Sequence, residues 1–291
     1  MTSASIQVFG STFQNPILLA AGTAGFGREL ADTIDLDALG GLVTKSVSPE
    51  PRTGNPPPRV AEFPGGMLNS VGLANPGLDA VERDELPWLE ARLRRARVLV
   101  SVVGNTVEDY VTVVRRLSER SVVTALELNL SCPNADRGGE LFGANEHVLA
   151  DLVMRCRAVT AKPLIVKLAP TLADIARSAR VAQGAGADGF SLVNTMPGML
   201  FRDGPAGPAS RPRLGAGHGG VSGPPLLPVG ILATHRVREA TGLPVIGVGG
   251  VRSVNDVRAY LAAGASLVGI GTAALAEPRL PERVARRIVR G

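Results

Sequence analysis

Short apolar runs recur along the chain, and most are separated by segments whose apolar residues have helical spacing. Eight runs have the length and composition of buried strands, and they are Ile17–Ala20, Gly41–Thr44, Val98–Val102, Ala125–Leu128, Leu164–Val166, Gly189–Val193, Pro244–Val248 and Leu267–Ile270. Three of the following segments place a hydroxyl residue three positions before a carboxylate, namely Thr106 with Asp109, Thr171 with Asp174 and Ser253 with Asp256. This spacing predicts an N-cap at the start of each helix.

Repeated strand–loop–helix units predict parallel strands joined by helical crossovers. Eight such units in 291 residues predict one α/β domain over residues 1–291, a (β/α)8 TIM barrel with a short N-terminal extension and long active-site loops. A doubly wound open sheet is the alternative that periodicity leaves open. In a barrel, functional residues gather at the carboxyl ends of the strands.

The composition argues against a nucleic-acid-binding, membrane or secreted protein. Aromatic residues make up 3% of the chain, which provides little surface for base stacking, and the net charge of +5 comes largely from arginines along helical segments. No apolar run approaches the roughly 18 residues of a membrane span, and the N-terminus lacks the pattern of a signal peptide. We therefore expect a cytoplasmic protein that binds neither nucleic acid nor membrane.

The strongest candidate for chemistry is Cys132, within Asn129-Leu-Ser-Cys-Pro-Asn134. Free cysteine is usually a buried small hydrophobe, but here it follows a strand and stands between asparagine amides and a hydroxyl. Cys156, the only other cysteine, lies in a segment with helical spacing and is expected in the core. The three histidines lack metal-ligand spacing, so no metal site is expected.

Two of the three lysines, Lys45 and Lys167, stand at strand ends in a chain that otherwise uses arginine. This choice favours a compact positive charge at the site. Asn69, Asn129 and Asn194 offer donors and acceptors that suit an amide- or imide-bearing ligand. Asparagine is disfavoured within strands, so its presence at these places favours contact with a ligand over a purely structural role.

Glycine-rich turns follow three of the strands. The first strand leads into residues 20–27, and the last two end in Gly247-Val-Gly249-Gly250 and Gly269-Ile-Gly271-Thr272. Loops after the seventh and eighth strands commonly form the phosphate site of such barrels, so we expect a phosphorylated ligand. The long segment Pro49–Pro76 is expected to be functional, while a lid and a partner surface remain open for Met196–Pro225.

With these residues assembled, the chain resembles the class 1 dihydroorotate dehydrogenases, and more narrowly the catalytic subunit of subclass B. The matching motifs are Gly22-Thr-Ala-Gly-Phe-Gly-Arg-Glu29, Pro51-Arg-Thr-Gly-Asn-Pro56, Asn69-Ser-Val-Gly-Leu73, Asn129-Leu-Ser-Cys-Pro-Asn134, Val166-Lys-Leu-Ala-Pro170, Val193-Asn-Thr195 and Gly249-Gly250 with Gly271-Thr272. The chain departs from the family at Ser101, where asparagine is usual, and at Ala21, which replaces a frequent serine.

The resemblance implies a (β/α)8 barrel that holds FMN and oxidises (S)-dihydroorotate to orotate in pyrimidine biosynthesis. It implies Cys132 as the general base and FMN as the hydride acceptor. The implied FMN contacts are Ala21, Gly22, Lys45, Ser46, Asn129, Lys167, Val193, Gly223, Gly249, Gly250, Gly271 and Thr272. The implied substrate contacts are Lys45, Asn69, Ser70, Val71, Gly72, Leu73, Asn129, Asn194 and Thr195.

The resemblance also implies a homodimer that forms a heterotetramer with a second subunit, which carries FAD and a [2Fe–2S] cluster and passes electrons to NAD. Two distant cysteines cannot ligate such a cluster, which generally takes four. The alternatives are a self-sufficient, fumarate-using homodimer, a flavin-free barrel with a covalent cysteine nucleophile resembling inosine monophosphate dehydrogenase, and a non-catalytic barrel that binds a phosphorylated ligand.

Overall fold

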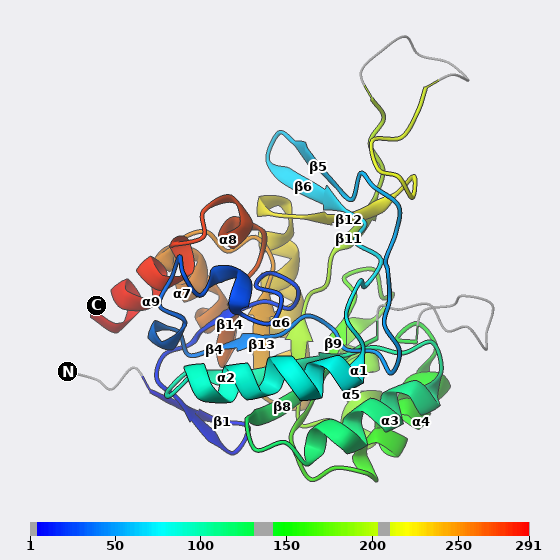
Figure 1. Cartoon of the computed structure of the whole chain (residues 1–291), viewed down its shortest axis with the longest axis vertical. Coiled ribbons are helices and arrows are strands. Elements are labelled where there is room, and N and C mark those ends of the chain that lie inside the picture. Colours follow the sequence, from blue (N-terminus) through cyan, green and yellow to red (C-terminus); the bar gives the residue numbers. More distant parts are fainter. Residues whose placement is uncertain (1–4, 131–141, 203–209, 291) are drawn as a thin grey trace.

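The fold is a closed barrel of eight parallel strands (Figure 1), seen in a computed structural model that describes residues 5–130, 142–202 and 210–290. The strands are β3 (Ile17–Leu19), β4 (Gly41–Val43), β7 (Arg97–Val102), β8 (Val123–Asn129), β9 (Leu164–Leu168), β10 (Gly189–Leu192), β13 (Val245–Val248) and β14 (Leu267–Ile270). Each matches one predicted run. β14 pairs with β3, which closes the barrel and excludes the open sheet.

Helices surround the barrel. They are α1 (Leu78–Ala80), η3 (Val81–Glu85), α2 (Leu86–Arg92), α3 (Val107–Ser118), α4 (Glu146–Arg157), α5 (Ile175–Gly184), α6 (Leu227–Thr241), α7 (Val254–Ala262), α8 (Thr272–Ala276) and α9 (Leu280–Arg290). The short 3-10 helices η1 (Arg28–Leu30) and η2 (Leu36–Ala38) lie between β3 and β4, and η5 (Pro224–Leu226) precedes α6. None of the helices in the described ranges is long and apolar enough to span a membrane.

Two of the three predicted N-caps are confirmed. Thr106 and Asp109 form a reciprocal capping box at α3, and the Ser253 hydroxyl accepts the Asp256 N–H at α7. The prediction for Thr171 is wrong, because α5 begins after Asp174 and the Asp174 carboxylate itself accepts the Arg177 N–H. A carboxylate is as good an N-cap as a hydroxyl, so the spacing could be read in two registers.

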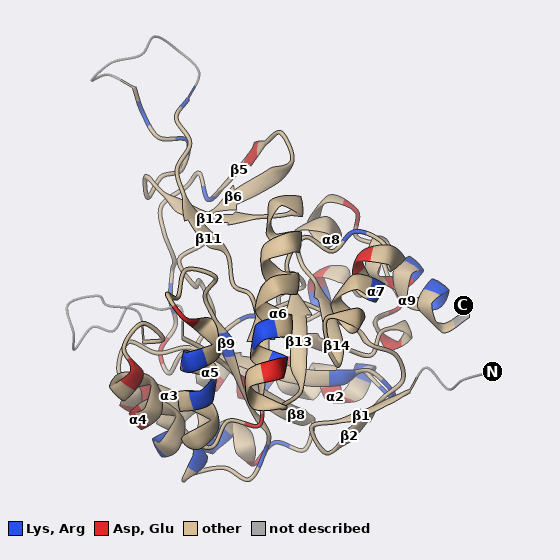
Figure 2. Ribbon diagram, turned by 180° about the vertical axis from the view of Figure 1, so that it is seen from behind, with Lys and Arg blue, Asp and Glu red and all other residues tan. Residues whose placement is uncertain are grey.

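Charged residues of both signs are interspersed along the outer helices (Figure 2). Arg155 of α4 pairs with Glu108 of α3, and Arg177 of α5 pairs with Glu146 of α4. These exposed pairs contribute little to stability. They show that arginines on these helices lie on solvated faces next to acidic partners, as the sequence predicted.

An N-terminal hairpin closes the bottom of the barrel. Its strands are β1 (Ile6–Val8) and β2 (Ser11–Phe13), paired antiparallel. Phe9 and Phe13 are buried in a cluster with inward-facing residues of the barrel strands, including Leu18 and Leu99. A Cβ at Gly189, at the start of β10, would lie 2.6 Å from the Phe9 ring, so the ring packs directly against the strand.

A four-stranded antiparallel sheet stands on the opposite, carboxyl-terminal side of the barrel (Figure 1). Its strands are β5 (Val60–Phe63), β6 (Gly66–Asn69), β11 (Met196–Gly198) and β12 (Gly219–Ser222), in the order β11-β12-β6-β5. We call this the cap sheet. It unites the two long segments that the sequence analysis treated as separate loops, because β12 pairs with β6.

The inside of the barrel changes character along its axis. Near the hairpin, the inward-facing residues Leu99, Ala125 and Ile165 are apolar and fully buried. Two positions further along the same strands stand Ser101, Glu127 and Lys167, which are also buried. Since alternate residues of a strand face the same side, polar groups fill the half of the barrel beneath the cap sheet.

Candidate active site

Asn129 is the centre of a polar network at the carboxyl ends of the strands. Its side-chain amide lies 3.5 Å from the Ser46 hydroxyl, and its oxygen accepts a hydrogen bond from Asn194 at 3.2 Å. The Tyr110 hydroxyl donates to the Asn129 carbonyl at 2.6 Å. Ser46 and Ser101 hydroxyls are 2.9 Å apart. Predicted residues from the ends of β4, β8 and β10 therefore form one connected group.

The same network continues into the cap sheet. The Asn194 side-chain oxygen accepts the Thr195 N–H at 2.8 Å. Gly220 of β12 lies against the Thr195 hydroxyl so closely that an added Cβ would be 2.0 Å from it. Asn69 donates to the Gly220 carbonyl at 3.2 Å. The structure thus brings together all three predicted asparagines, Asn69, Asn129 and Asn194.

The segment from Ser70 to Leu73 is held by the Pro51–Pro56 segment. Asn55 donates from its backbone to the Val71 carbonyl and from its side chain to the Ser70 hydroxyl at 2.7 Å. Gly72 and Leu73 both have positive φ. This conformation is unfavourable for a leucine, so the contacts of the neighbouring segment must hold the turn in place. Two separate sequence motifs form one structural unit.

Buried Asn75 anchors the far end of this turn. Its side chain donates to the Ser48 hydroxyl at 2.8 Å and to the Leu73 carbonyl at 2.9 Å, and it accepts the Gly77 N–H. The turn that carries the predicted substrate residues is therefore tied to the segment that follows β4 and Lys45.

Both strand-end lysines lie at the mouth of the barrel. Lys45 is half-buried, and its N–H donates to the Gly25 carbonyl in the loop after β3. Lys167 is buried and lies in register with Asn129 on one side and Ser191 on the other. Its ammonium is 3.6 Å from the Glu127 carboxylate. Both lysines therefore stand at the carboxyl ends of barrel strands, on β9 and directly after β4.

Three glycine-containing loops meet on the other side of the mouth. The Thr272 hydroxyl donates to the Ser222 hydroxyl at 2.8 Å, which joins the loop after β14 to the one after β12. The Tyr260 hydroxyl donates to the Gly249 carbonyl at 2.8 Å and fixes the turn after β13. Gly223, Gly249 and Gly250 all have positive φ. Backbone amides in such turns can bind a phosphate.

Open space lies beside the loop after β3. A Cβ added at Gly22 would meet nothing within 4 Å, and one at Gly271 would touch only Ala20 and Thr23 at 3.7 Å. Ala21 precedes this opening and is partly buried. The Val193 N–H donates to the Val248 carbonyl, which ties the end of β10 to the glycine turn. In the strand order of the barrel, the ends of β4, β8, β9 and β10 carry the lysines and two of the asparagines, and the ends of β3, β13 and β14 carry the glycine loops.

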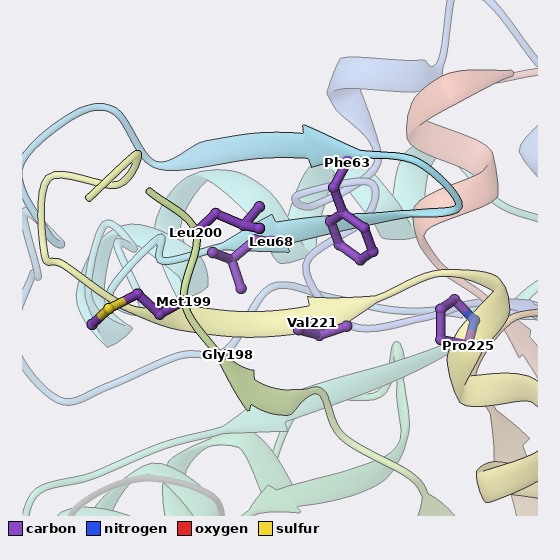
Figure 3. Close-up of a pocket in the computed structure, with 7 residues that line it drawn as sticks. All are labelled: Phe63, Leu68, Gly198, Met199, Leu200, Val221 and Pro225. Atoms are coloured by element: carbon purple, nitrogen blue, oxygen red, sulfur yellow. The ribbon is translucent and has the colours of Figure 1, made fainter. Parts of the chain in front are cut away.

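The cap sheet also carries a hollow of about 250 Å³ (Figure 3). Its lining is apolar and consists of Phe63, Leu68, Gly198, Met199, Leu200, Val221 and Pro225. These residues do not include any of the polar residues predicted for the site. The hollow is therefore separate from the polar network and offers no group that could carry acid–base chemistry.

Of the two cysteines, the structure describes only Cys156. Cys132, with the rest of residues 131–141, lies outside the described residues, and Asn129 is the last predicted site residue before it. Cys156 is fully buried in α4, and burial raises the pKa of its thiol to about 12. The prediction that Cys156 is a core residue is confirmed.

Several residues of the site were missed from the sequence. Glu127 and Ser191 are buried on the barrel interior that also holds Lys167, and within the described ranges neither Glu127 Oε1 nor Ser191 Oγ has a hydrogen-bond partner. Asn55 and Asn75 hold the turn of residues 70–73 in place by hydrogen bonds. Tyr110 holds the Asn129 backbone in the same way. Strand alternation could have found Glu127, because it lies two positions before Asn129.

Comparison with known proteins agrees with this geometry. The family model for dihydroorotate dehydrogenase matches residues 3–290. The chain is 44% identical over 278 residues to the "Dihydroorotate dehydrogenase B (NAD(+)), catalytic subunit" of Bacillus cereus (strain G9842), covering 96% of this chain and 88% of that protein. It is 45% identical to the protein of the same name from Geobacillus kaustophilus (strain HTA426), covering 96% and 87%.

A crystal structure of the Eimeria tenella enzyme DHODH in complex with ferulenol has the same fold, with a TM-score of 0.80 at 24% identity, covering 99% of this chain and 84% of that one. The resemblance inferred from the motifs is confirmed by the family match and by the two bacterial relatives. The chain belongs to the dihydroorotate dehydrogenase family.

Proposed function

We propose that this chain is the catalytic subunit of an NAD-linked dihydroorotate dehydrogenase, which oxidises (S)-dihydroorotate to orotate with FMN. The observation that carries the proposal is the gathering of predicted residues at the carboxyl ends of the barrel strands, with lysines and asparagines on one arc of the barrel and glycine loops on the other. This arrangement suits a ligand with a phosphate at one end and a polar ring at the other.

The residues fit FMN. The joined loops at Gly223, Gly249–Gly250 and Gly271–Thr272 offer a cradle for its phosphate, and the open space at Gly22 leaves room for the rest of the molecule. The remaining proposed contacts, which follow the barrel mouth, are Ala21, Lys45, Ser46, Asn129, Lys167 and Val193. When bound, FMN supplies a hydride acceptor, and the protein supplies orientation and charge.

Lys167 has the clearest role toward that group. It lies in the interior on β9, in register with Asn129 on β8 and Ser191 on β10. A fixed positive charge stabilises negative charge that develops during a reaction, and it does so more strongly in a site that excludes water. Lys167 therefore favours the reduced form of the bound cofactor.

The asparagines and the turn after β6 bind the substrate in this proposal. Dihydroorotate carries ring N–H groups, carbonyls and a carboxylate, so it needs donors and acceptors together with a positive charge. Asn69, Asn129, Asn194 and Thr195 supply the amides and the hydroxyl, and Lys45 supplies the charge. Residues 70–73, in the turn that follows β6, are the remaining proposed substrate contacts.

Cys132 is the proposed general base, removing the proton from carbon 5 of dihydroorotate. In the sequence it follows Asn129, a proposed substrate contact, by three residues. Free cysteine has a pKa near ~8.5 and must be deprotonated to act as a base.

The electrons then pass to NAD through a second protein. The names of the bacterial relatives specify NAD(+) and a catalytic subunit, and the present chain has only two cysteines, too few for an iron–sulfur cluster of its own. We therefore propose a barrel homodimer that binds two FAD- and [2Fe–2S]-containing subunits. One domain, residues 1–291, supplies the dihydroorotate half-reaction.

Steady-state assays of the isolated chain test this proposal. We expect rapid reduction of an artificial dye by dihydroorotate, little reduction of NAD, and recovery of NAD reduction when the second subunit is added. Brisk turnover with fumarate, or with NAD in the absence of a partner, would contradict the two-subunit arrangement. A colourless protein that takes up no FMN would contradict the flavin enzyme altogether.

A further inference from the structure

Glu127 is a buried carboxylate in the interior of the barrel. It is 1% exposed, and it stands on β8 two positions before Asn129, on the same face of the strand. Among the described residues it forms an ion pair with Lys167, whose ammonium is 3.6 Å from the carboxylate oxygen Oε1, and this oxygen has no hydrogen-bond partner there. Barrel interiors are usually filled by branched apolar side chains.

A structural role alone does not account for this residue. Burying a carboxylate is costly, and a pair of buried charges is often no more stable than apolar residues of the same volume. The neighbouring inward positions show that apolar filling is available here, since Ala125 and Ile165 pack tightly one layer below. A carboxylate at this position therefore indicates an electrostatic role that an apolar side chain could not fill.

We propose that Glu127 is a positioning residue that holds the Lys167 ammonium beneath the FMN site and partly cancels its charge, so that it sets the reduction potential of the bound flavin. This inference rests on the proposed function. Lys167 is the mobile member of the pair, because its four-carbon stem has several rotamers, and Glu127 fixes which of them faces the site.

The sign of the effect follows from charge. Lys167 alone favours the more negative, reduced form of the cofactor, and Glu127 opposes this preference. Glu127→Gln keeps the size of the side chain and an acceptor for Lys167 but removes the negative charge. We expect the ratio of the affinities for reduced and oxidised FMN to rise about tenfold. For a two-electron couple this raises the reduction potential of the bound flavin by about 30 mV.

A double-mutant cycle tests whether Glu127 acts through Lys167. The potential of bound FMN is measured spectroscopically in the parental protein, Glu127→Gln, Lys167→Met and the double variant. We expect the effect of Glu127→Gln to fall to less than a third of its size in the Lys167→Met background. Glu127→Asp should stay near the parental value, and exposed Glu119→Gln, at the far end of α3, should change nothing.

Three results would overturn the inference: an unchanged potential in Glu127→Gln, an equal shift in both backgrounds, or an equal shift from Glu119→Gln. Thermal unfolding of the flavin-free chain gives a second readout. Lys167→Met should lower the unfolding temperature by leaving Glu127 unpaired, and the double variant should recover part of the loss; strictly additive losses would show that the two residues are not coupled. If the parental protein takes up no FMN, the proposed function fails, while the unfolding cycle still tests the pair.

Discussion

Gly250→Ala is the sharpest perturbation of the proposed phosphate cradle. Gly250 has a φ of 73°, and a Cβ added there would lie 2.7 Å from both the backbone nitrogen and the Cβ of Leu227. Ordinary contact begins at 3.4 Å, so the turn after β13 would have to move by about 0.7 Å. The neighbouring backbone cannot yield easily, because Leu227 begins α6.

A shift of that size is large for a hydrogen bond. Charge-assisted bonds to a phosphate are about 2.7–2.9 Å long and contribute roughly 1.5–3 kcal/mol each. Losing one or two of them, about 1.5–6 kcal/mol in total, predicts FMN binding weaker by about 10- to 10⁴-fold. The left-handed backbone adds a cost of about 1–2 kcal/mol to folding, which is independent of the ligand.

Gly242→Ala is the matched control. Gly242 ends α6 with a φ of 67°, and a Cβ there would meet nothing within 4 Å. Both variants should lose about the same unfolding free energy from the backbone term, but only Gly250→Ala should lose FMN. FMN affinity is measured by fluorescence titration of the flavin-free chain. Binding by Gly250→Ala within twofold of the parental protein, or an equal loss in Gly242→Ala, would refute the cradle.

Three further predictions address chemistry, reactivity and stability. Cys132→Ser should keep the flavin but slow its reduction by dihydroorotate by about 10²–10⁴-fold at neutral pH, since serine is a far weaker acid; stopped-flow reduction at parental speed would exclude Cys132 as the base. Burial raises the pKa of the Cys156 thiol to about 12, so its thiolate is scarce below that pH and alkylating reagents should modify Cys156 only after unfolding; mass spectrometry showing modification of the native protein at neutral pH would contradict this. Phe13→Ala should lower the unfolding free energy by about 3–5 kcal/mol, because Phe13 is fully buried in the N-terminal hairpin that closes the bottom of the barrel. Denaturant unfolding measures this loss, and flavin absorbance should show an unchanged FMN content. A loss below about 1 kcal/mol would show that the hairpin does not support the core.

The barrel could be predicted from the sequence because its strands are short apolar runs that are bounded by glycine, proline or polar residues. β14 illustrates this, since Leu267–Ile270 is wholly buried and is followed by a glycine. The cap sheet could not be predicted. β12 contains two glycines in four residues, and β5 lacks a buried residue, so neither has the apolar alternation that marks a strand.

The site divides in the same way. Residues at strand ends, such as Asn129 and Asn194, stood out because polar residues directly follow apolar runs, and the structure joins them by a hydrogen bond. Glu127 was overlooked because it lies inside a strand, where a carboxylate has no motif to identify it. Asn75 was overlooked because its role is to hold a turn, and the contacts that define that role come from the fold.

Anaerobic titration of the purified chain with dihydroorotate tests the central proposal most directly. The experiment follows flavin absorbance and orotate formation together, without a partner subunit or an added acceptor. We predict that the flavin is reduced once per chain and that one orotate forms for each flavin reduced. An FMN-loaded protein whose flavin stays oxidised with excess dihydroorotate, or flavin reduction without orotate, would contradict the account.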